Sequence, residues 1–270
     1  MDERLVTYAL EDEVALVGID RAAKRNAVSD AVMTQLRQAI VRATDEARCG
    51  ILFGHGGNFS AGLDLAEASR RMQDADGGAA QIRRRGRWTR PLELVARGPI
   101  PWVAALTGAC IGGGLEIASA CQIRVADETT FFALPEGKRG IFVGGGGSVR
   151  IQRLMGYARM ADLMLTGRVL SAAEGERANL CQYVVPAGGA LDKARELARQ
   201  IATNAPTTNW AICSALPRIN DMGHEDGLFF ESLIGGGARS ADREERLRAF
   251  VERGENKVAA PPTPSTQGEG

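Results

Sequence analysis

The chain has 270 residues, of which 44% are hydrophobic and 24% are charged, so its composition predicts a sizeable core and argues against general disorder. Its 33 basic and 33 acidic residues give a formal net charge of zero, which supplies no global field to attract nucleic acid or an anionic membrane. The five cysteines show no paired spacing, and we interpret them as buried small residues in a reducing compartment rather than as a disulfide framework.

The N-terminal stretch, MDERLVTYALEDE, is acidic and contains no apolar segment of the kind found in signal peptides. No window of the sequence approaches the roughly 18 uninterrupted apolar residues that a membrane-spanning helix requires. We therefore expect a cytoplasmic protein that does not enter a membrane.

The N-terminal half predicts strands that alternate with helices, an order that indicates an α/β fold with parallel strand pairing. Strands are expected where short apolar or alternating runs lie between turn residues, namely at 5–20 (two strands), 50–55, 101–108 and 121–136 (one or two strands). Residues 29–47 predict a helix, because apolar residues recur every four positions after Ser29, which is a favourable N-cap.

The C-terminal part of the chain predicts helices. Residues 191–202 show one apolar side, and the pattern stays almost entirely helical to about residue 253. The final stretch, AAPPTPSTQGEG, is rich in Pro, Thr, Ser and Gly and predicts a disordered tail. No internal repeat is visible in the sequence.

Residues 66–98 differ from their surroundings, since they contain a Gly-Gly break and arginines at 83, 84, 85 and 87. The more common interpretation of such a segment is a solvated helix face with a mobile loop. The alternative is an active-site lid with a basic rim for phosphates. Trp88 either lines a roomy pocket or anchors a helix.

The stretch ACIGGGLEIASAC (109–121) places three glycines and Glu116 inside an apolar run. A helix start leaves backbone N–H groups unpaired, and glycines allow a ligand to approach them. The spacing is neither that of a dinucleotide-binding loop nor that of a phosphate loop. A buried carboxylate costs several kcal/mol unless it is paired, so taken alone Glu116 is equally well interpreted as a functional or a structural residue.

Two further segments place carboxylates beside glycine-rich turns. NFSAGLDL (58–65) contains Asp64, and LPEGKRGIFVGGGGS (134–148) contains Glu136 and four consecutive glycines. In isolation, Asp64 is typical of a helix-capping residue, Glu136 of an exposed loop residue and the glycine run of a flexible connector.

Together these segments resemble the enoyl-CoA hydratase/isomerase (crotonase) superfamily. The resemblance lies in four ordered segments: DRAAKRNAVS (20–29), GHGGNFSAGLDL (54–65), IPWVAALTGACIGGGLEIASACQIRVA (100–126) and FFALPEGKRGIFVGGGGSVRIQRLMG (131–156). LTGRVLSAAEGERANLCQYVVP (165–186) also matches the pattern, and the resemblance covers about residues 4–253.

The resemblance implies an α/β fold built as a crotonase-like spiral of ββα units over residues 1–190. A C-terminal helical trimerisation region would follow at 191–258, with residues 259–270 as the disordered tail. It also implies a homotrimer or a dimer of trimers. The substrate would be an acyl-CoA thioester, so coenzyme A would enter with the substrate and no separate cofactor or metal is expected. No nucleic-acid partner is expected either.

The shared chemistry of the superfamily is stabilisation of a thioester enolate by two backbone N–H groups, which by resemblance match Ala61 and Gly113. Members that hydrate use two glutamates, which match Glu116 and Glu136, to hold water, take its proton and protonate the α-carbon. The resemblance thus predicts an enoyl-CoA hydratase that adds water syn to a trans-2-enoyl-CoA. The remaining implied substrate contacts, mostly through the backbone, are Lys24, Ala27, Gly62, Leu63, Asp64, Leu65, Gly112 and Pro135, with Phe230 and Arg253 reaching a neighbouring subunit's coenzyme A.

Alternatives stay open within and outside this class. Another acyl-CoA enzyme of the superfamily (a double-bond isomerase, a hydrolase or a lyase) would use the same enolate, and a non-catalytic RNA-binding relative would use the arginines at 83–87. The chain departs from the commonest pattern at Ala22, at Gln122, where an Asp is usual, and at Val143, where a Pro is usual. These departures put the acyl specificity in doubt more than the class.

Overall fold

The computed structural model describes residues 3–73, 77–237, 241 and 243–254, and side chains within 71–85 lie outside that description. In the described part of the chain the strands form two sheets. The larger sheet has the order β1 (Val6–Glu11), β2 (Val14–Ile19), β3 (Cys49–Gly54), β4 (Trp102–Leu106), β6 (Ile123–Asp127) and β9 (Tyr183–Val185). The smaller sheet has the order β5 (Ala109–Ile111), β7 (Phe131–Ala133) and β8 (Val169–Ser171).

The pairing agrees with the predicted alternation of strands and helices. Strands β1 and β2 form an antiparallel hairpin whose two turn residues, Asp12 and Glu13, have φ of 48° and 63°. That left-handed pair matches the twist of the flanking strands. Every other pairing in the larger sheet is parallel, as expected for strands joined through helices on the faces of the sheet.

In the described residues, two ββα units run between the larger and the smaller sheet. Strands β4 and β5 lead into helix α4 (Gly113–Ala118), and strands β6 and β7 lead into helix α5 (Glu136–Arg139). In each unit the first strand joins the larger sheet and the second joins the smaller one, so β4 pairs with β6 and β5 pairs with β7. This repeated topology confirms the predicted spiral of ββα units, although the sequence shows no internal repeat. It also brings the starts of α4 and α5 to one end of the sheets.

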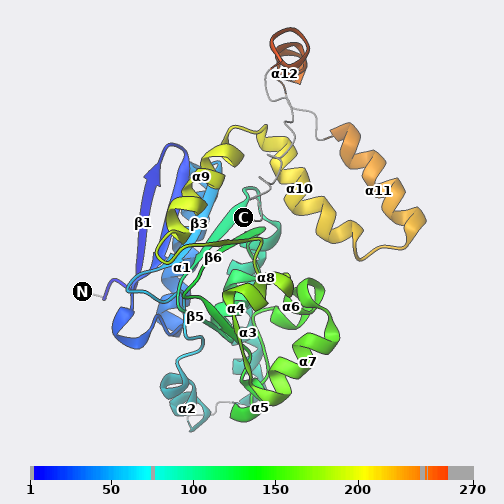
Figure 1. Ribbon diagram of the computed structural model, residues 1–270. Coiled ribbons are helices and arrows are strands. Elements are labelled where there is room, and N and C mark those ends of the chain that lie inside the picture. The colour runs from blue at the N-terminus through cyan, green and yellow to red at the C-terminus, as the bar shows by residue number, and fades with distance from the viewer. Residues whose placement is uncertain (1–2, 74–76, 238–240, 242, 255–270) are drawn as a thin grey trace, which may run out of the picture.

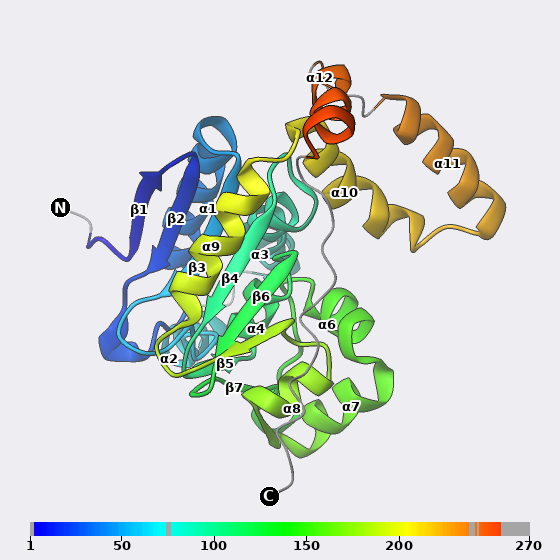
Figure 2. The same cartoon turned by 45° about the horizontal axis from the view of Figure 1, so that its top comes forward.

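Helices cover both faces of the larger sheet. Helix α9 (Ala190–Ala202) lies along one face (Figure 2), where Val103 and Ala105 of β4 meet its apolar side. Helices α1 (Asp30–Glu46) and α3 (Gly77–Arg97) belong to the core on the other face, which also takes Trp102 and Ala104. The alternation along β4 follows from the two-residue period of a strand. The predicted helices at 29–47 and 191–202 are confirmed, and the Ser29 side chain accepts from Val32 N at 3.2 Å as an N-cap.

The C-terminal helices extend beyond the two sheets (Figure 1). They are α10 (Pro206–Ile219), α11 (His224–Gly237), α12 (Arg243–Arg248) and the π-helical turn η2 (Ala249–Arg253), and within the described residues they confirm the predicted helical pattern. Helix α11 buries only Gly227 and exposes Leu228, Phe229 and Leu233. The predicted tail at 259–270 lies outside the described residues.

The remaining short elements connect these layers. They are η1 (Ala22–Lys24), α2 (Leu65–Gln73), α6 (Gly147–Met155), α7 (Tyr157–Thr166) and α8 (Ala172–Arg177). The segment 66–98 therefore contributes to helices α2 and α3. The last turns of α3 are fully buried at Leu92 and Val95, so this end of the segment belongs to the core rather than to a lid. The side chains of the arginines at 83–85 lie outside the described residues.

Gln122 attaches the end of α3 to strand β4. Its side-chain oxygen accepts from Trp102 N at 2.8 Å, and its amide nitrogen donates to the carbonyls of Val95 and Ala96 at 3.1 and 3.0 Å. A carboxylate could accept the first of these bonds but could not donate the other two. The glutamine that replaces the usual Asp therefore has a structural role that suits its amide group.

The five cysteines are buried and free, as their lack of paired spacing predicted. Burial raises the pKa of the Cys49, Cys121 and Cys181 thiols to about 12. In the described residues no helix is both long and apolar enough to cross a membrane.

Candidate active site

A cavity of about 350 Å³ lies where the two ββα units meet helix α3. It is lined by Leu63, Trp88, Gly113, Glu116, Glu136, Ile141, Phe142, Val143, Gly144 and Gly145. Each part of the wall comes from a different element: the loop before α2, helix α3, the start of α4, the start of α5 and the loop from α5 to α6. The fold thus brings together the three segments that sequence analysis singled out separately.

Glu116, on helix α4, is buried with 4% of its surface exposed. Its Oε1 accepts hydrogen bonds from the N–H groups of Gly145 at 2.7 Å and Gly147 at 2.9 Å. Burial raises the pKa of this carboxyl, while the backbone donors favour its charged form and partly offset the effect of burial. The Glu116 carboxylate is therefore held by the glycine run 144–147, whose two donors lie 29 and 31 residues further along the chain.

Glu136, the first residue of α5, is also only 4% exposed. Its Oε2 is buried and finds no hydrogen-bond partner in the described part of the chain. Burial raises the pKa of Glu136, and the negative charge of Glu116 raises it further. Buried polar atoms usually have partners, so an unpaired carboxyl oxygen on a cavity wall is a group available to a ligand. The two carboxyls thus share one cavity but have different surroundings.

The backbone donors of the cavity differ from those predicted. The Ala61 N–H donates to the Arg25 carbonyl at 2.9 Å, and Ala61 does not line the cavity, so the prediction for this residue is wrong. The bonds from Val28 N to Gly62 O and from Asp64 N to Val28 O direct the Leu63 N–H away from Val28. Leu63 takes the place predicted for Ala61.

Leu63 and Gly113 present their N–H groups close together. A Cβ added to Gly113 would lie 3.4 Å from Leu63 N, and one added to Gly62 would lie 3.2 Å from Gly113 N. Among the residues described, neither N–H donates to another group of the chain. Gly113 is the first residue of α4, where an N–H has no partner within the helix. The prediction that Gly113 exposes a donor is therefore supported by the geometry, with Leu63 as the second donor.

Trp88 lines the cavity beside Gly113. Its Cζ3 would be 3.1 Å from a Cβ on Gly113, so the indole would have to shift slightly to admit a side chain at that position. Ile141, Phe142 and Val143 add further apolar wall, and Phe142 is 70% exposed at the rim. Of the two interpretations of Trp88, the structure therefore favours a cavity wall.

Asp64 connects two loops beside the cavity, and its predicted contact with the substrate stays a prediction. It is 6% exposed, and its Oδ2 lies 2.7 Å from Arg21 Nη1 and 3.6 Å from Lys24 Nζ. Its Oδ1 accepts from Glu67 N at 3.2 Å and so caps the start of α2. Burial alone would raise the pKa of Asp64, but the two cations outweigh burial and lower it. Asp64 thereby joins the loop around 21–28 to the loop that carries Leu63.

The other predicted contacts lie outside the cavity wall. Gly112 is the N-cap of α4 with φ of 51°, and a Cβ there would lie 2.9 Å from Glu136 Oε1, while Pro135 is the N-cap of α5. Gly112 and Pro135 adjoin the wall without belonging to it, and the other residues outside it are Lys24, Ala27, Gly62 and Leu65 in the adjoining loops, Phe230 on α11 and Arg253 in η2. That Phe230 and Arg253 serve a neighbouring subunit stays a prediction.

Comparison with known proteins adds an independent observation. Residues 9–259 match the sequence profile of the family described as enoyl-CoA hydratase/isomerase. The chain is 36% identical over 249 residues to enoyl-CoA hydratase EchA19 of Mycobacterium tuberculosis, covering 88% of this chain and 90% of that protein. It is 32% identical over 248 residues to the mitochondrial enoyl-CoA hydratase domain-containing protein 2 of Bos taurus, covering 89% and 82%.

Solved structures share the same fold. A crystal structure from Rhodopseudomonas palustris, described provisionally as an enoyl-CoA hydratase, superposes with a TM-score of 0.86 at 44% identity and covers 94% of this chain and 97% of that one. The crystal structure of enoyl-CoA hydratase from Bacillus anthracis gives a TM-score of 0.84 at 30% identity, covering 93% and 97%.

Proposed function

The chain belongs to the enoyl-CoA hydratase/isomerase family, and from this premise we propose that it adds water across the 2,3 double bond of a trans-2-enoyl-CoA thioester. The observation that carries the proposal is the convergence of the Glu116 and Glu136 carboxyls on one cavity, beside the N–H groups of Leu63 and Gly113. Coenzyme A enters as part of the substrate, so the proposal requires no separate cofactor.

In this mechanism the two backbone donors bind the thioester carbonyl oxygen. As water adds at C3, electrons move toward that oxygen and it gains enolate character. N–H groups that are already oriented typically contribute a few kcal/mol each to such a developing charge. The N–H groups of Leu63 and Gly113 suit this role because nothing else in the described chain accepts their hydrogens.

The two glutamates divide the proton transfers according to their surroundings. The N–H groups of Gly145 and Gly147 stabilise the charged form of Glu116, so Glu116 acts as the base that orients water and takes its proton. Glu136 Oε2 has no such donor, and burial together with the Glu116 charge favours its protonated form. Glu136 therefore delivers a proton to C2 as the new C3–O bond forms. Because both groups line one cavity, we expect water to add syn.

The decisive experiment follows the loss of conjugated enoyl absorbance with a short trans-2-enoyl-CoA. Glu116→Ala and Glu136→Ala should each lower kcat by about 1,000-fold or more, as expected for removal of a general acid or base. Glu128→Ala, which removes an exposed carboxylate from the turn after β6, serves as the matched control and should leave kcat unchanged. Wild-type rates in either active-site variant would disprove the two-carboxylate mechanism. Full turnover of a 3-enoyl-CoA by Glu116→Ala would instead identify an isomerase.

We also propose that the chain assembles as a homotrimer or a dimer of trimers through its C-terminal helices. The exposed apolar side chains of α11, Leu228, Phe229 and Leu233, support this proposal, because soluble proteins seldom leave such a group uncovered. Light scattering of the wild type and of Phe229→Asp tests this proposal. The molar mass of the assembly should be smaller for the variant, and a monomeric wild type would overturn the proposal.

A further inference from the structure

The loop that holds Glu116 is weakly constrained by its own composition. Four consecutive glycines, 144–147, connect the cavity wall to helix α6, and glycine loses more backbone freedom on ordering than any other residue. Yet two of these residues, Gly145 and Gly147, must point their N–H groups at a single carboxylate oxygen. Some other contact has to fix the path of the run.

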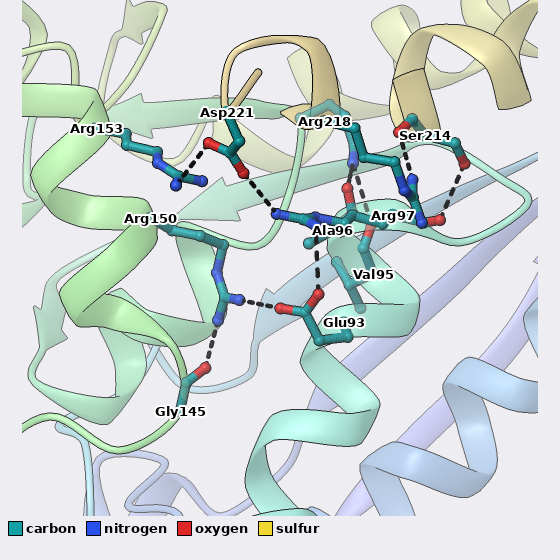
Figure 3. A network of polar contacts seen from close by, with 11 residues as sticks. Glu93, Val95, Ala96, Arg97, Gly145, Arg150, Arg153, Ser214, Arg218 and Asp221 are labelled. Carbon is teal, nitrogen blue, oxygen red and sulfur yellow. Dashed lines mark hydrogen bonds and ion pairs between the residues drawn. The ribbon is translucent and has the colours of Figure 1, made fainter. Parts of the chain in front are cut away.

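Arg150, one turn into α6, provides that contact (Figure 3). Its Nη2 donates to the Gly145 carbonyl, and its Nη1 lies 2.8 Å from Glu93 Oε1 on helix α3. The Arg150 side chain is only 13% exposed. Gly145 is therefore held on both sides, with its N–H bound to Glu116 and its carbonyl bound to Arg150.

We propose that Arg150, anchored by Glu93, is the positioning residue that fixes Gly145 so that Glu116 is aimed at the reacting water. The guanidinium suits this task because its planar set of N–H groups reaches a carbonyl and a carboxylate at once. The effect that we expect on kcat rests on the proposed hydratase function, whereas the effect on the path of residues 144–147 does not.

The contribution of the Glu93–Arg150 pair lies in geometry more than in stability. Glu93 is 49% exposed, and ion pairs with an exposed member contribute little to folding. Displacement of a catalytic group by about 1 Å, in contrast, can lower a rate by about 100-fold. Removing the pair should therefore affect turnover far more than folding.

The same helix offers a matched control. Arg153 also pairs with a carboxylate, since its Nη2 lies 2.7 Å from Asp221 Oδ1. Asp221 in turn lies 3.7 Å from Arg97 Nη2, and Arg97 Nε lies 3.8 Å from Glu93 Oε2, so Arg153 reaches the glycine run only indirectly, through this chain of ion pairs (Figure 3). Loss of Arg153 removes a similar charge and a similar ion pair from α6 without releasing Gly145.

The test compares Arg150→Gln, Arg150→Lys, Glu93→Gln and Arg153→Gln. Amide hydrogen exchange over residues 144–147 should speed up by about 10-fold or more in Arg150→Gln, because local opening exposes the Gly145 and Gly147 N–H groups. With a short trans-2-enoyl-CoA, kcat should fall by about 10- to 100-fold while KM changes by less than about 2-fold. Arg150→Lys and Glu93→Gln should show smaller losses in the same direction, and Arg153→Gln should match the wild type.

Two results would overturn the proposal: unchanged exchange over 144–147 in Arg150→Gln, or equal losses in Arg150→Gln and Arg153→Gln. If Arg150→Gln fails to fold, Arg150→Lys and Glu93→Gln carry the same comparison against the control. If the wild type does not turn over any enoyl-CoA, the proposed function fails, and the exchange measurement still decides whether Arg150 positions the loop.

Discussion

The two glycine runs of the cavity are held in different ways. Gly112–Gly114 follows strand β5, and its path is set by the backbone: the Gly112 N–H donates to Ala133 O at 2.9 Å, and Gly114 packs against the backbone of Ser60. Gly144–Gly147 follows no strand and is held by the side chains of Glu116 and Arg150. The backbone donors are therefore part of the folded core, whereas the support of Glu116 depends on a few side chains and can be disturbed separately.

The largest effect on folding is expected from Gly114→Ala in the first run. The added Cβ would lie 2.6 Å from Ser60 O and 2.9 Å from Ser60 Cβ, and backbone there cannot move away easily. Overpacking of a tight core typically costs 1–3 kcal/mol, so we expect the free energy of unfolding to fall by about 3 kcal/mol. Urea denaturation measures it, and a loss below about 0.5 kcal/mol would show that packing does not fix this run.

Gly147→Ala should affect kcat more than the free energy of unfolding. Its Cβ would lie 2.7 Å from Glu116 Cγ, so the side chain of the base has to shift. We expect kcat to fall by about 100-fold, equivalent to about 2.7 kcal/mol of barrier, with a smaller loss of unfolding free energy than in Gly114→Ala. Steady-state kinetics and urea denaturation of the same preparations check this. A variant with normal kcat but reduced stability would remove the distinction between the runs.

The pH dependence of stability should differ between variants of Glu136 and Glu116, because only Glu116 is held by the glycine run 144–147. Burial raises the pKa of Glu136 above its ordinary value of 4.5, so the folded protein holds this proton more tightly than the unfolded chain does. The group therefore stabilises the fold most below pH 4.5, and this stability is lost as pH rises through the folded-state pKa. The neutral amide in Glu136→Gln does not titrate, so the variant does not lose this stability. The unfolding free energy of the variant minus that of the wild type should therefore increase from pH 4 to pH 8.

Glu116→Gln should show a weaker increase over the same pH range. The N–H groups of Gly145 and Gly147 already favour the charged form of Glu116, and a neutral amide would accept weaker hydrogen bonds from them. Denaturation curves at pH 4, 6 and 8 compare the two variants. An equal or larger increase for Glu116→Gln would show that the second run gives the carboxylate no special support.

The smallest effect is expected from Gly144→Ala. A Cβ at this position would meet no heavy atom within 4 Å, and its φ lies outside the left-handed region. The free energy of unfolding should stay the same or rise by at most about 1 kcal/mol, because alanine has less backbone freedom to lose. Thermal or urea denaturation measures the change. A clear destabilisation would mean that the second run is packed as tightly as the first.

Elements with strong local patterns could be predicted from the sequence. The hairpin at 5–20 and the helices at 29–47 and 191–202 follow from periodicity and capping, and the resemblance selected Glu116 and Glu136, which the structure places on one cavity. The error at Ala61 has a specific cause. The direction of each N–H along 60–64 depends on which neighbouring carbonyls lie alongside, and Arg25 accepts from Ala61 while Val28 accepts from Asp64.

The side-chain contacts that support the site could not be predicted, because they join distant parts of the chain. Arg150 reaches Glu93 across 57 positions, and Gln122 reaches Val95 across 27. No local pattern marks an arginine as the partner of a particular carbonyl or a glutamine as the connection between a helix and a strand. The departure from the usual Asp at Gln122 was visible in the sequence, but its meaning required the two carbonyls that it binds.

Because all five cysteines are buried, the reactivity of their thiols can report local unfolding of the chain. Cys49 belongs to the layer under α9, whereas Cys110 and Cys121 belong to the core on the opposite face of the sheet. Only an exposed thiolate reacts readily with an alkylating reagent, so each of these sulfurs becomes reactive when its own layer separates. The order in which the native protein takes up a thiol label would thus reveal which of the two layers comes apart first, without any engineered probe.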